Sequence, residues 1–144
     1  MTLILNKKLL DRIEKHAEKA YPDEGAGLLI GQVKGETRRV QAVLELTNNS
    51  QGESKHNRYL ISPQDLLKGE KEASARNMDV LGVFHSHPDH PNQPSEFDRK
   101  WALPWFSYMI TSVNEGIAAG NRSWRLSEDR SQFFEEEMHI TDVE

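Results

Sequence analysis

Apolar residues recur at helical spacing near the start of the chain. The stripe consists of Leu9, Leu10, Ile13, Ala17 and Ala20, with charged residues between them. This spacing predicts an amphipathic helix over 7–20. Asn6 can cap its first turn, and Tyr21-Pro22 should end it. His16 lies outside the apolar stripe, so we expect it at the solvated surface.

Short apolar runs and alternating stretches predict strands in most of the remaining chain. The predicted strands cover 3–5, 26–30, 37–46, 59–61, 79–87, 103–111, 115–120 and 124–126. Lys34-Gly35 can form the turn that pairs the second strand with the third. Polar residues at 47–57 predict a loop in which His56 is solvated. In the acidic tail at 133–144, we expect Glu135-Glu136-Glu137 to be a solvated face and His139 a surface residue.

Two further helices are predicted by the residues at which they start. Ser62 followed by Pro63 is typical of a helix start, and this helix should run to about Asn77, with Gly69 weakening its middle. A short helix should begin at Ser95 and run to about residue 101. The alternation of strands and helices indicates a mixed α/β layer protein.

The composition fits one small domain and excludes several kinds of site. A length of 144 residues favours a single domain over 1–144. The chain has no cysteine, which excludes disulfides and thiolate zinc sites. A net charge of −5 gives no basic face for nucleic acid, and no apolar run is long enough to span a bilayer. Because the N-terminus has no signal-peptide pattern, we expect a soluble cytoplasmic protein that binds neither nucleic acid nor membrane.

Potential metal ligands are concentrated between Val83 and Asp98. His85 and His87 lie two residues apart on a predicted strand, so their side chains project from the same face. The loop that follows ends at Ser95, and Ser95-x-x-Asp98 has the pattern of a capping box, which would aim the Asp98 carboxylate. Two nitrogens and one oxygen without sulfur suit zinc with a fourth position open for water. The sequence thus indicates a catalytic zinc site.

Two other zinc chemistries share parts of this pattern. The run from His85 to His90 fits H-x-H-x-D-H, which resembles the metal motif of the metallo-β-lactamase superfamily. That fold needs a longer chain and further ligands downstream, where only His139 follows, so we expect Asp89 and His90 to be exposed loop residues. Nucleobase deamination needs a P-C-x-x-C motif, which a chain without cysteine lacks.

The spacing His85-x-His87-Pro88, then six residues, then Ser95-x-x-Asp98 resembles the JAMM motif of the MPN+ metalloproteases. The segment 22–31 resembles the one that carries this family's catalytic glutamate, which here is Glu24. Taken alone, Glu24 would be expected as an exposed loop acid. The resemblance follows the element order to about residue 110. It implies a cytidine-deaminase-like α/β fold, in which helices flank a mixed β-sheet.

The resemblance also implies hydrolysis of peptide or isopeptide bonds at the C-terminus of a ubiquitin-like protein. By position in the motif, His85, His87 and Asp98 would bind Zn²⁺. Glu24 would be the general base that takes a proton from water and passes it to the leaving amine. Ser95 would donate a hydrogen bond to the tetrahedral oxyanion.

The chain lacks the insertions with which eukaryotic family members grip polyubiquitin. Only 46 residues follow Asp98, and they contain no cysteine. This is similar to minimal prokaryotic members, which process ubiquitin-like sulfur-carrier proteins by removing a C-terminal extension or releasing a carried amino acid. The alternative is a non-catalytic MPN-type module that only binds partner proteins. Intact ligands weigh against this alternative, because such relatives typically lack them.

Overall fold

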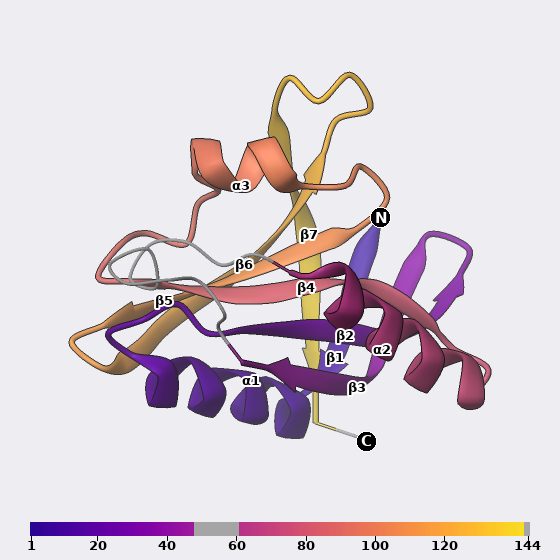
Figure 1. Cartoon of the computed structure of the whole chain (residues 1–144), viewed down its shortest axis with the longest axis horizontal. Coiled ribbons are helices and arrows are strands. Elements are labelled where there is room, and N and C mark those ends of the chain that lie inside the picture. Colours follow the sequence, from indigo (N-terminus) through magenta and orange to yellow (C-terminus); the bar gives the residue numbers. More distant parts are fainter. Residues whose placement is uncertain (48–60, 143–144) are drawn as a thin grey trace.

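The computed structural model describes residues 1–47 and 61–142, and in this part of the chain seven strands form one mixed sheet (Figure 1). The strands are β1 (Thr2–Asn6), β2 (Ala26–Lys34), β3 (Thr37–Leu46), β4 (Asp79–Pro88), β5 (Ser107–Asn114), β6 (Ile117–Leu126) and β7 (Phe133–Thr141). They lie in the order β1-β3-β2-β4-β5-β6-β7, and β7 pairs in parallel with β1. This last pairing closes the sheet into a barrel.

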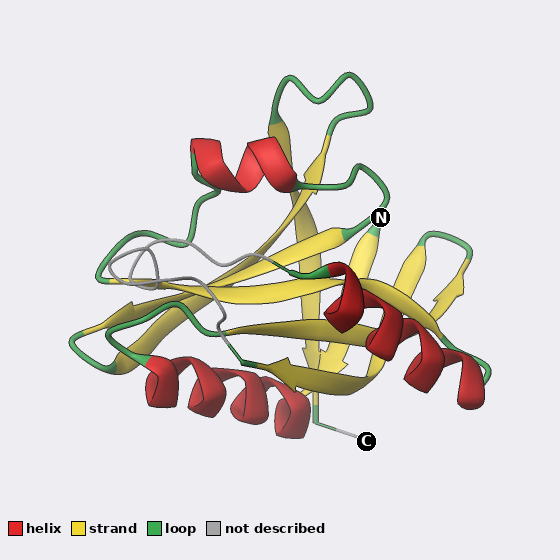
Figure 2. Ribbon diagram, viewed as in Figure 1, coloured by secondary structure: helices red, strands yellow, loops and turns green. Residues whose placement is uncertain are grey.

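The described residues form three helices, α1 (Lys7–Ala20), α2 (Pro63–Ala75) and α3 (Glu96–Trp101), which flank the sheet (Figure 2). The start of α1 is fixed by Asn6, whose side chain accepts a hydrogen bond from the Leu9 N–H at 2.7 Å. Ser62 caps α2 in the same way, through the Asp65 N–H at 3.0 Å. Both N-caps were predicted from the sequence. No helix in these residues is long and apolar enough to cross a membrane.

The central strands are buried on both faces because their alternate side chains serve two apolar clusters. Leu29 of β2 and Phe84 of β4 belong to the cluster that Ile13 of α1 completes. Leu28 and Val83 belong to a second cluster with residues of α2. Strands buried on both faces have nearly continuous apolar sequences, as β2 and β4 do. β4 lies between antiparallel β2 and parallel β5, and its C-terminal end carries His85 and His87.

Most predicted elements are found, but the C-terminal part of the chain differs from expectation. The predicted strands 115–120 and 124–126 are one continuous strand, β6. It begins later than predicted because Glu115 and Gly116 form the turn that precedes it. β5 begins at Ser107 rather than at residue 103. The acidic tail contains β7, which the sequence analysis did not predict. The expectation of a solvated face is wrong for Glu136, which is buried and accepts a hydrogen bond from the Ser123 hydroxyl at 2.6 Å.

The structure also bears on three smaller predictions, which concern His16, Gly69 and the strand 59–61. His16 is half-buried rather than solvated, with its Nε2 3.1 Å from the Ala26 carbonyl oxygen and its ring edge-on to Phe84. Gly69 lies where α2 approaches β2, and a Cβ there would lie 2.3 Å from Leu28 Cδ1. Its absence of a side chain therefore permits close helix–sheet packing. Of the predicted strand 59–61, the first two residues lie outside the described residues, as does His56, and Ile61 is not in a strand.

Candidate metal centre

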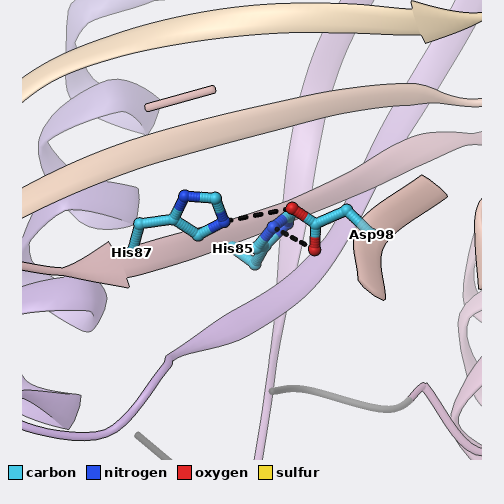
Figure 3. Close-up of side chains that lie close together, drawn as sticks. All are labelled: His85, His87 and Asp98. Atoms are coloured by element: carbon cyan, nitrogen blue, oxygen red, sulfur yellow. Dashed lines mark hydrogen bonds and ion pairs between the residues drawn. The ribbon is translucent and has the colours of Figure 1, made fainter. Parts of the chain in front are cut away.

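His85, His87 and Asp98 come together at the C-terminal end of β4 (Figure 3). The two histidines project from the same face of β4, and Asp98 reaches them from α3. Asp98 Oδ1 lies 3.2 Å from His85 Nε2, and Asp98 Oδ2 lies 3.1 Å from His87 Nε2. One ligand atom from each of the three side chains lies within 4.8 Å of the other two. The three form a cluster that is able to bind a metal ion.

Two of these side chains are oriented by backbone groups nearby. His87 Nδ1 lies 2.9 Å from the Pro91 carbonyl oxygen. When Nδ1 donates its hydrogen there, the lone pair of Nε2 faces the cluster, and metal-binding histidines typically have such a partner. The capping box predicted from the sequence is formed: the Ser95 N–H donates to Asp98 Oδ2 at 2.8 Å, and the Asp98 N–H donates to Ser95 Oγ at 3.1 Å.

The third side chain, His85, gives the clearest indication that the cluster fits a cation. Its side chain is only 7% exposed, and its Nε2 is buried without a hydrogen-bond partner among the described residues. The geometry towards Asp98 is that of an ion pair rather than of a hydrogen bond. Asp98 Oδ1, 3.2 Å away, neutralises this nitrogen when it is protonated, and a bound cation can take the place of that proton. Two imidazole nitrogens and one carboxylate oxygen directed at one point form a donor set that suits zinc.

The charges of the three side chains support one another. Burial acts to lower the pKa of His85, but the negative charge of Asp98 outweighs burial and raises this pKa to about 9. Burial acts to raise the pKa of Asp98, but His85 and His87 hold it far below its usual range. The carboxylate therefore stays charged, and a cation competes with a proton for His85.

Glu24 lies just before β2 and is buried, with only 4% of its surface exposed. In the pairing of β2 with β4, Ala26 stands opposite His85. Gly25 extends this pairing, because its N–H donates to Ser86 Oγ at 2.8 Å and its carbonyl oxygen accepts from the Ser86 N–H at 3.0 Å. Burial raises the pKa of Glu24 to about 7, although the positive charges of His85 and His87 oppose this. Glu24 is thus no exposed loop acid, and a carboxyl with this pKa can both take and return a proton near neutrality.

Two clefts are each lined in part by residues of the cluster. The first, of about 500 Å³, includes Glu24, His87 and Ser95 in its lining, and we call it the base-side cleft. The second, of about 180 Å³, includes His85 and Asp98, and we call it the apolar cleft because the rest of its lining is mainly aliphatic and aromatic. These lining residues are Ile61, Leu66, Val83, Phe97, Trp101, Ala102, Leu103, Phe106 and Tyr108. Open space therefore lies next to both histidines.

The remaining candidates are placed as follows. Ser95 is exposed and lies at the base-side cleft, and its capping bond uses the oxygen, which leaves the hydroxyl hydrogen to donate. Asp89 and His90 are exposed and stay outside the cluster. Asp89 nevertheless has partners that the sequence did not indicate: its carboxylate accepts from the Tyr21 hydroxyl at 2.6 Å and from the Glu115 N–H at 2.8 Å.

Comparison with protein families identifies the domain. The protein-family model described as prokaryotic homologues of the JAB domain matches residues 6–127 of this chain. The chain belongs to this family. The resemblance to the JAMM/MPN+ proteins is thereby confirmed, and so is the predicted α/β fold with a mixed sheet flanked by helices.

Individual relatives and a solved structure extend the comparison. A probable TtuB-protein conjugate cleaving protease of Thermus thermophilus is 32% identical over 116 residues, 78% of this chain and 74% of that protein. A desampylase of Pyrococcus furiosus is 34% identical over 74 residues, 49% of this chain and 48% of the relative. The solution structure of a Desulfitobacterium hafniense protein superposes with a TM-score of 0.86 at 31% identity, covering 98% of this chain and 94% of that one. One relative of this chain is thus named as a probable protease.

Proposed function

We propose that this chain is a zinc-dependent peptidase or isopeptidase that hydrolyses the bond at the C-terminus of a ubiquitin-like protein, with a sulfur-carrier protein as the substrate. The observation that carries the proposal is that the buried carboxyl of Glu24 lines the same cleft as His87 and Ser95, beside the His85–His87–Asp98 cluster. A cluster of two histidines and one aspartate fits the metal, and the carboxyl fits the base that a hydrolase needs. The Thermus relative, named for cleaving TtuB–protein conjugates, supports the choice of substrate.

In the proposed reaction each side chain has one task. His85, His87 and Asp98 hold the metal, which when bound supplies Lewis acidity to water and to the scissile carbonyl. Glu24 takes a proton from water as the oxygen attacks the carbonyl carbon, and it delivers that proton to the leaving nitrogen as the C–N bond breaks. The Ser95 hydroxyl donates a hydrogen bond to the carbonyl oxygen as negative charge develops there. Loss of one such donor typically costs about 2.7–4 kcal/mol of transition-state stabilisation.

The two clefts fit a substrate that lies across the cluster in an extended conformation. The scissile bond then sits beside Glu24 and Ser95, and one neighbouring part of the substrate enters the apolar cleft. Because that cleft is lined mainly by aliphatic and aromatic side chains, it favours an apolar side chain close to the scissile bond.

Metal analysis combined with a cleavage assay tests the proposal. The substrates are a sulfur-carrier protein with a C-terminal peptide extension and the same carrier joined to a lysine side chain. We expect one zinc ion per chain and cleavage of at least one substrate. Glu24→Gln should keep the zinc and slow cleavage by about 10²–10⁴-fold, since it removes the general base. Glu128→Gln, which changes an exposed acid of the β6–β7 turn, is the matched control and should cleave at the wild-type rate.

Two results would contradict the proposal. If Glu24→Gln cleaved as fast as the wild type, Glu24 would not be the base. If the protein bound the carrier tightly but neither bound zinc nor cleaved it, the chain would instead be a protein-interaction module.

A further inference from the structure

The helix that supplies Asp98 has little of its own to hold it in place. α3 has six residues, and none of them is fully buried. A helix this short is not stable by its own hydrogen bonds, because nucleation is costly and few bonds follow it. The position of Asp98 relative to β4 therefore depends on what anchors α3 at its two ends. The capping box of Ser95 and Asp98 anchors the first end.

The second end is held by Arg130, which lies in the turn between β6 and β7. Its Nη1 donates to the Ala102 carbonyl oxygen at 2.6 Å. Its Nη2 donates to the carbonyl oxygens of Lys100 at 3.1 Å and Arg99 at 3.3 Å. The last carbonyls of a helix lack partners within the helix, and a cation is favourable at that end. One guanidinium thus caps α3 from a distant part of the chain.

The link between the turn and the helix runs in both directions. Arg99 of α3 donates through its Nη1 to the Arg130 carbonyl oxygen at 2.9 Å. Upstream of α3, the Trp124 indole N–H of β6 donates to the Asn92 carbonyl oxygen at 3.0 Å. The loop before α3 and the end of α3 are therefore both fastened to the same hairpin.

The turn itself is cross-linked by hydrogen bonds, so that it can serve as an anchor. The Ser127 N–H donates to the Gln132 carbonyl oxygen at 2.8 Å, and the Arg130 N–H donates to the Ser127 carbonyl oxygen at 2.9 Å. Asp129 Oδ1 accepts from the hydroxyls of Ser127 and Ser131, each at 2.7 Å, and from the Ser131 N–H at 3.0 Å. These bonds fix the backbone from which Arg130 extends.

We propose that Arg130 is a positioning residue that holds α3, and with it Asp98, at the distance from His85 and His87 that metal binding requires. Arg130 hydrogen-bonds the backbone at the end of the helix rather than the Asp98 carboxylate, so it acts through the helix. Arg130 also lies beyond the residues 6–127 that match the JAB family, so the family comparison does not assign it this role. The inference rests on the proposed function in one respect, which is that these three side chains bind zinc.

Zinc affinity tests this inference without any measurement of cleavage. The full chain and its variants are titrated with zinc against a competing chelator, and Co²⁺ absorption spectra report the geometry of the ligands. We expect Arg130→Ala to weaken zinc binding by about 10-fold or more, within the range typical of residues that orient metal ligands. Arg130→Lys should lie between Arg130→Ala and the wild type, since it keeps the charge but cannot reach three carbonyls. Arg122→Ala is the control, because Arg122 is exposed on β6. Its only ion pair within the described residues joins its Nε to Glu135 Oε2 at 3.9 Å.

The outcomes separate this inference from the proposed function. If the wild type binds zinc and folded Arg130→Ala binds it equally well with an unchanged Co²⁺ spectrum, the role of Arg130 is refuted while the proposed function stands. If the wild type binds no zinc, both fail. If Arg130→Ala does not fold, Arg130→Lys provides the test. Wild-type zinc affinity in the folded Arg130→Lys protein would refute the role of the guanidinium, and weakened zinc affinity would support it.

Discussion

The backbone N–H of Gly25 donates a hydrogen bond to the hydroxyl of Ser86 across 2.8 Å. Gly25 follows Glu24 directly, and Ser86 stands between His85 and His87, with only 1% of its surface exposed. Because alternate residues of a strand face opposite sides, this hydroxyl points away from the metal cluster and is no ligand. It joins the segment of Glu24 to the strand that carries the two histidines, so that Glu24 and the cluster keep one relative position.

Ser86→Ala should reduce kcat while leaving zinc content unchanged. The substitution removes the acceptor for a buried N–H, which costs about 1–3 kcal/mol of folding stability and lets the segment of Glu24 shift. Single-turnover cleavage, zinc analysis and thermal unfolding measure the three effects separately. Ser86→Thr keeps the hydroxyl and should restore kcat. A variant Ser86→Ala that is less stable but retains the full kcat would show that the bond serves the fold alone.

The metal-free protein should lose stability as the pH rises from about 4.5 to about 9. The folded-state pKa of Glu24 is raised from 4.5 to about 7, and that of His85 from 6.5 to about 9. In this range the folded state binds more protons than the unfolded state, so the free energy of unfolding falls with rising pH. The raised pKa of His85 corresponds to a decrease in the free energy of unfolding on the order of 3 kcal/mol across this pH range.

Urea unfolding in the presence of a chelator, at about pH 5, 7 and 9, measures this dependence. His85→Gln should lessen the decrease between about pH 7 and pH 9, because the part of the decrease that Glu24 causes lies mainly below about pH 7. Zinc should reverse the trend, because it binds the deprotonated ligands. Stability of the metal-free wild type that is flat over this range would be inconsistent with the charge arrangement of the cluster.

Gly69→Ala should destabilise the protein, although alanine normally stabilises a helix interior by about 1 kcal/mol relative to glycine. The added Cβ would lie 2.3 Å from Leu28 Cδ1, and Leu28 is fully buried in the cluster between α2 and the sheet. Overpacking of this kind typically costs about 1–3 kcal/mol. Ser74→Ala, at an exposed position of the same helix, is the control and should change stability little. A Gly69→Ala protein that unfolds at higher urea concentration than the wild type would contradict the packing argument.

Trp101→Ala should raise KM for the proposed substrate, the sulfur-carrier protein with a C-terminal extension, by about 5- to 30-fold and leave zinc content unchanged. The Trp101 side chain lines the apolar cleft and is 57% exposed, so its removal takes away contact area for substrate rather than core packing. Loss of part of an apolar contact of this size costs about 1–2 kcal/mol. Ile117→Ala changes an exposed apolar residue at the β5–β6 turn and should leave KM unchanged. Equal KM values for both variants would place the substrate outside the apolar cleft.

The metal cluster could be predicted from the sequence because its geometry is set by residues that lie close together along the chain. Two histidines on one face of a strand and a capping box at a helix start are both set by spacing over a few residues, and both are found. The position of Glu24 depends instead on the pairing of Gly25 with Ser86, which lies 61 residues further along the chain. Only the family resemblance pointed to Glu24, since its local surroundings predicted a loop acid.

The C-terminal strands were harder to predict because their residues do not alternate cleanly between apolar and polar. β7 carries the run Glu135 to Glu137, yet its Glu136 is buried, and one of its carboxylate oxygens accepts a hydrogen bond from the Ser123 hydroxyl of β6. Arg38 of β3 is also fully buried, where its guanidinium donates to the Leu81 carbonyl oxygen at 2.9 Å. Charged residues whose partners lie on other strands give no local signal of burial. The same reason explains why Arg130 could not be recognised before the structure placed it against α3.

The closure of the sheet also bears on how the protein is made. Leu3 and Leu5 of β1 pair with Met138 and Ile140 of β7, and both leucines are fully buried in the folded chain. During synthesis β1 leaves the ribosome well before β7, so the barrel cannot close until residues 133–141 have been made. Products that end before residue 133 keep an unpaired strand edge beside apolar residues. Such fragments should aggregate or be degraded rather than persist as a partly folded domain.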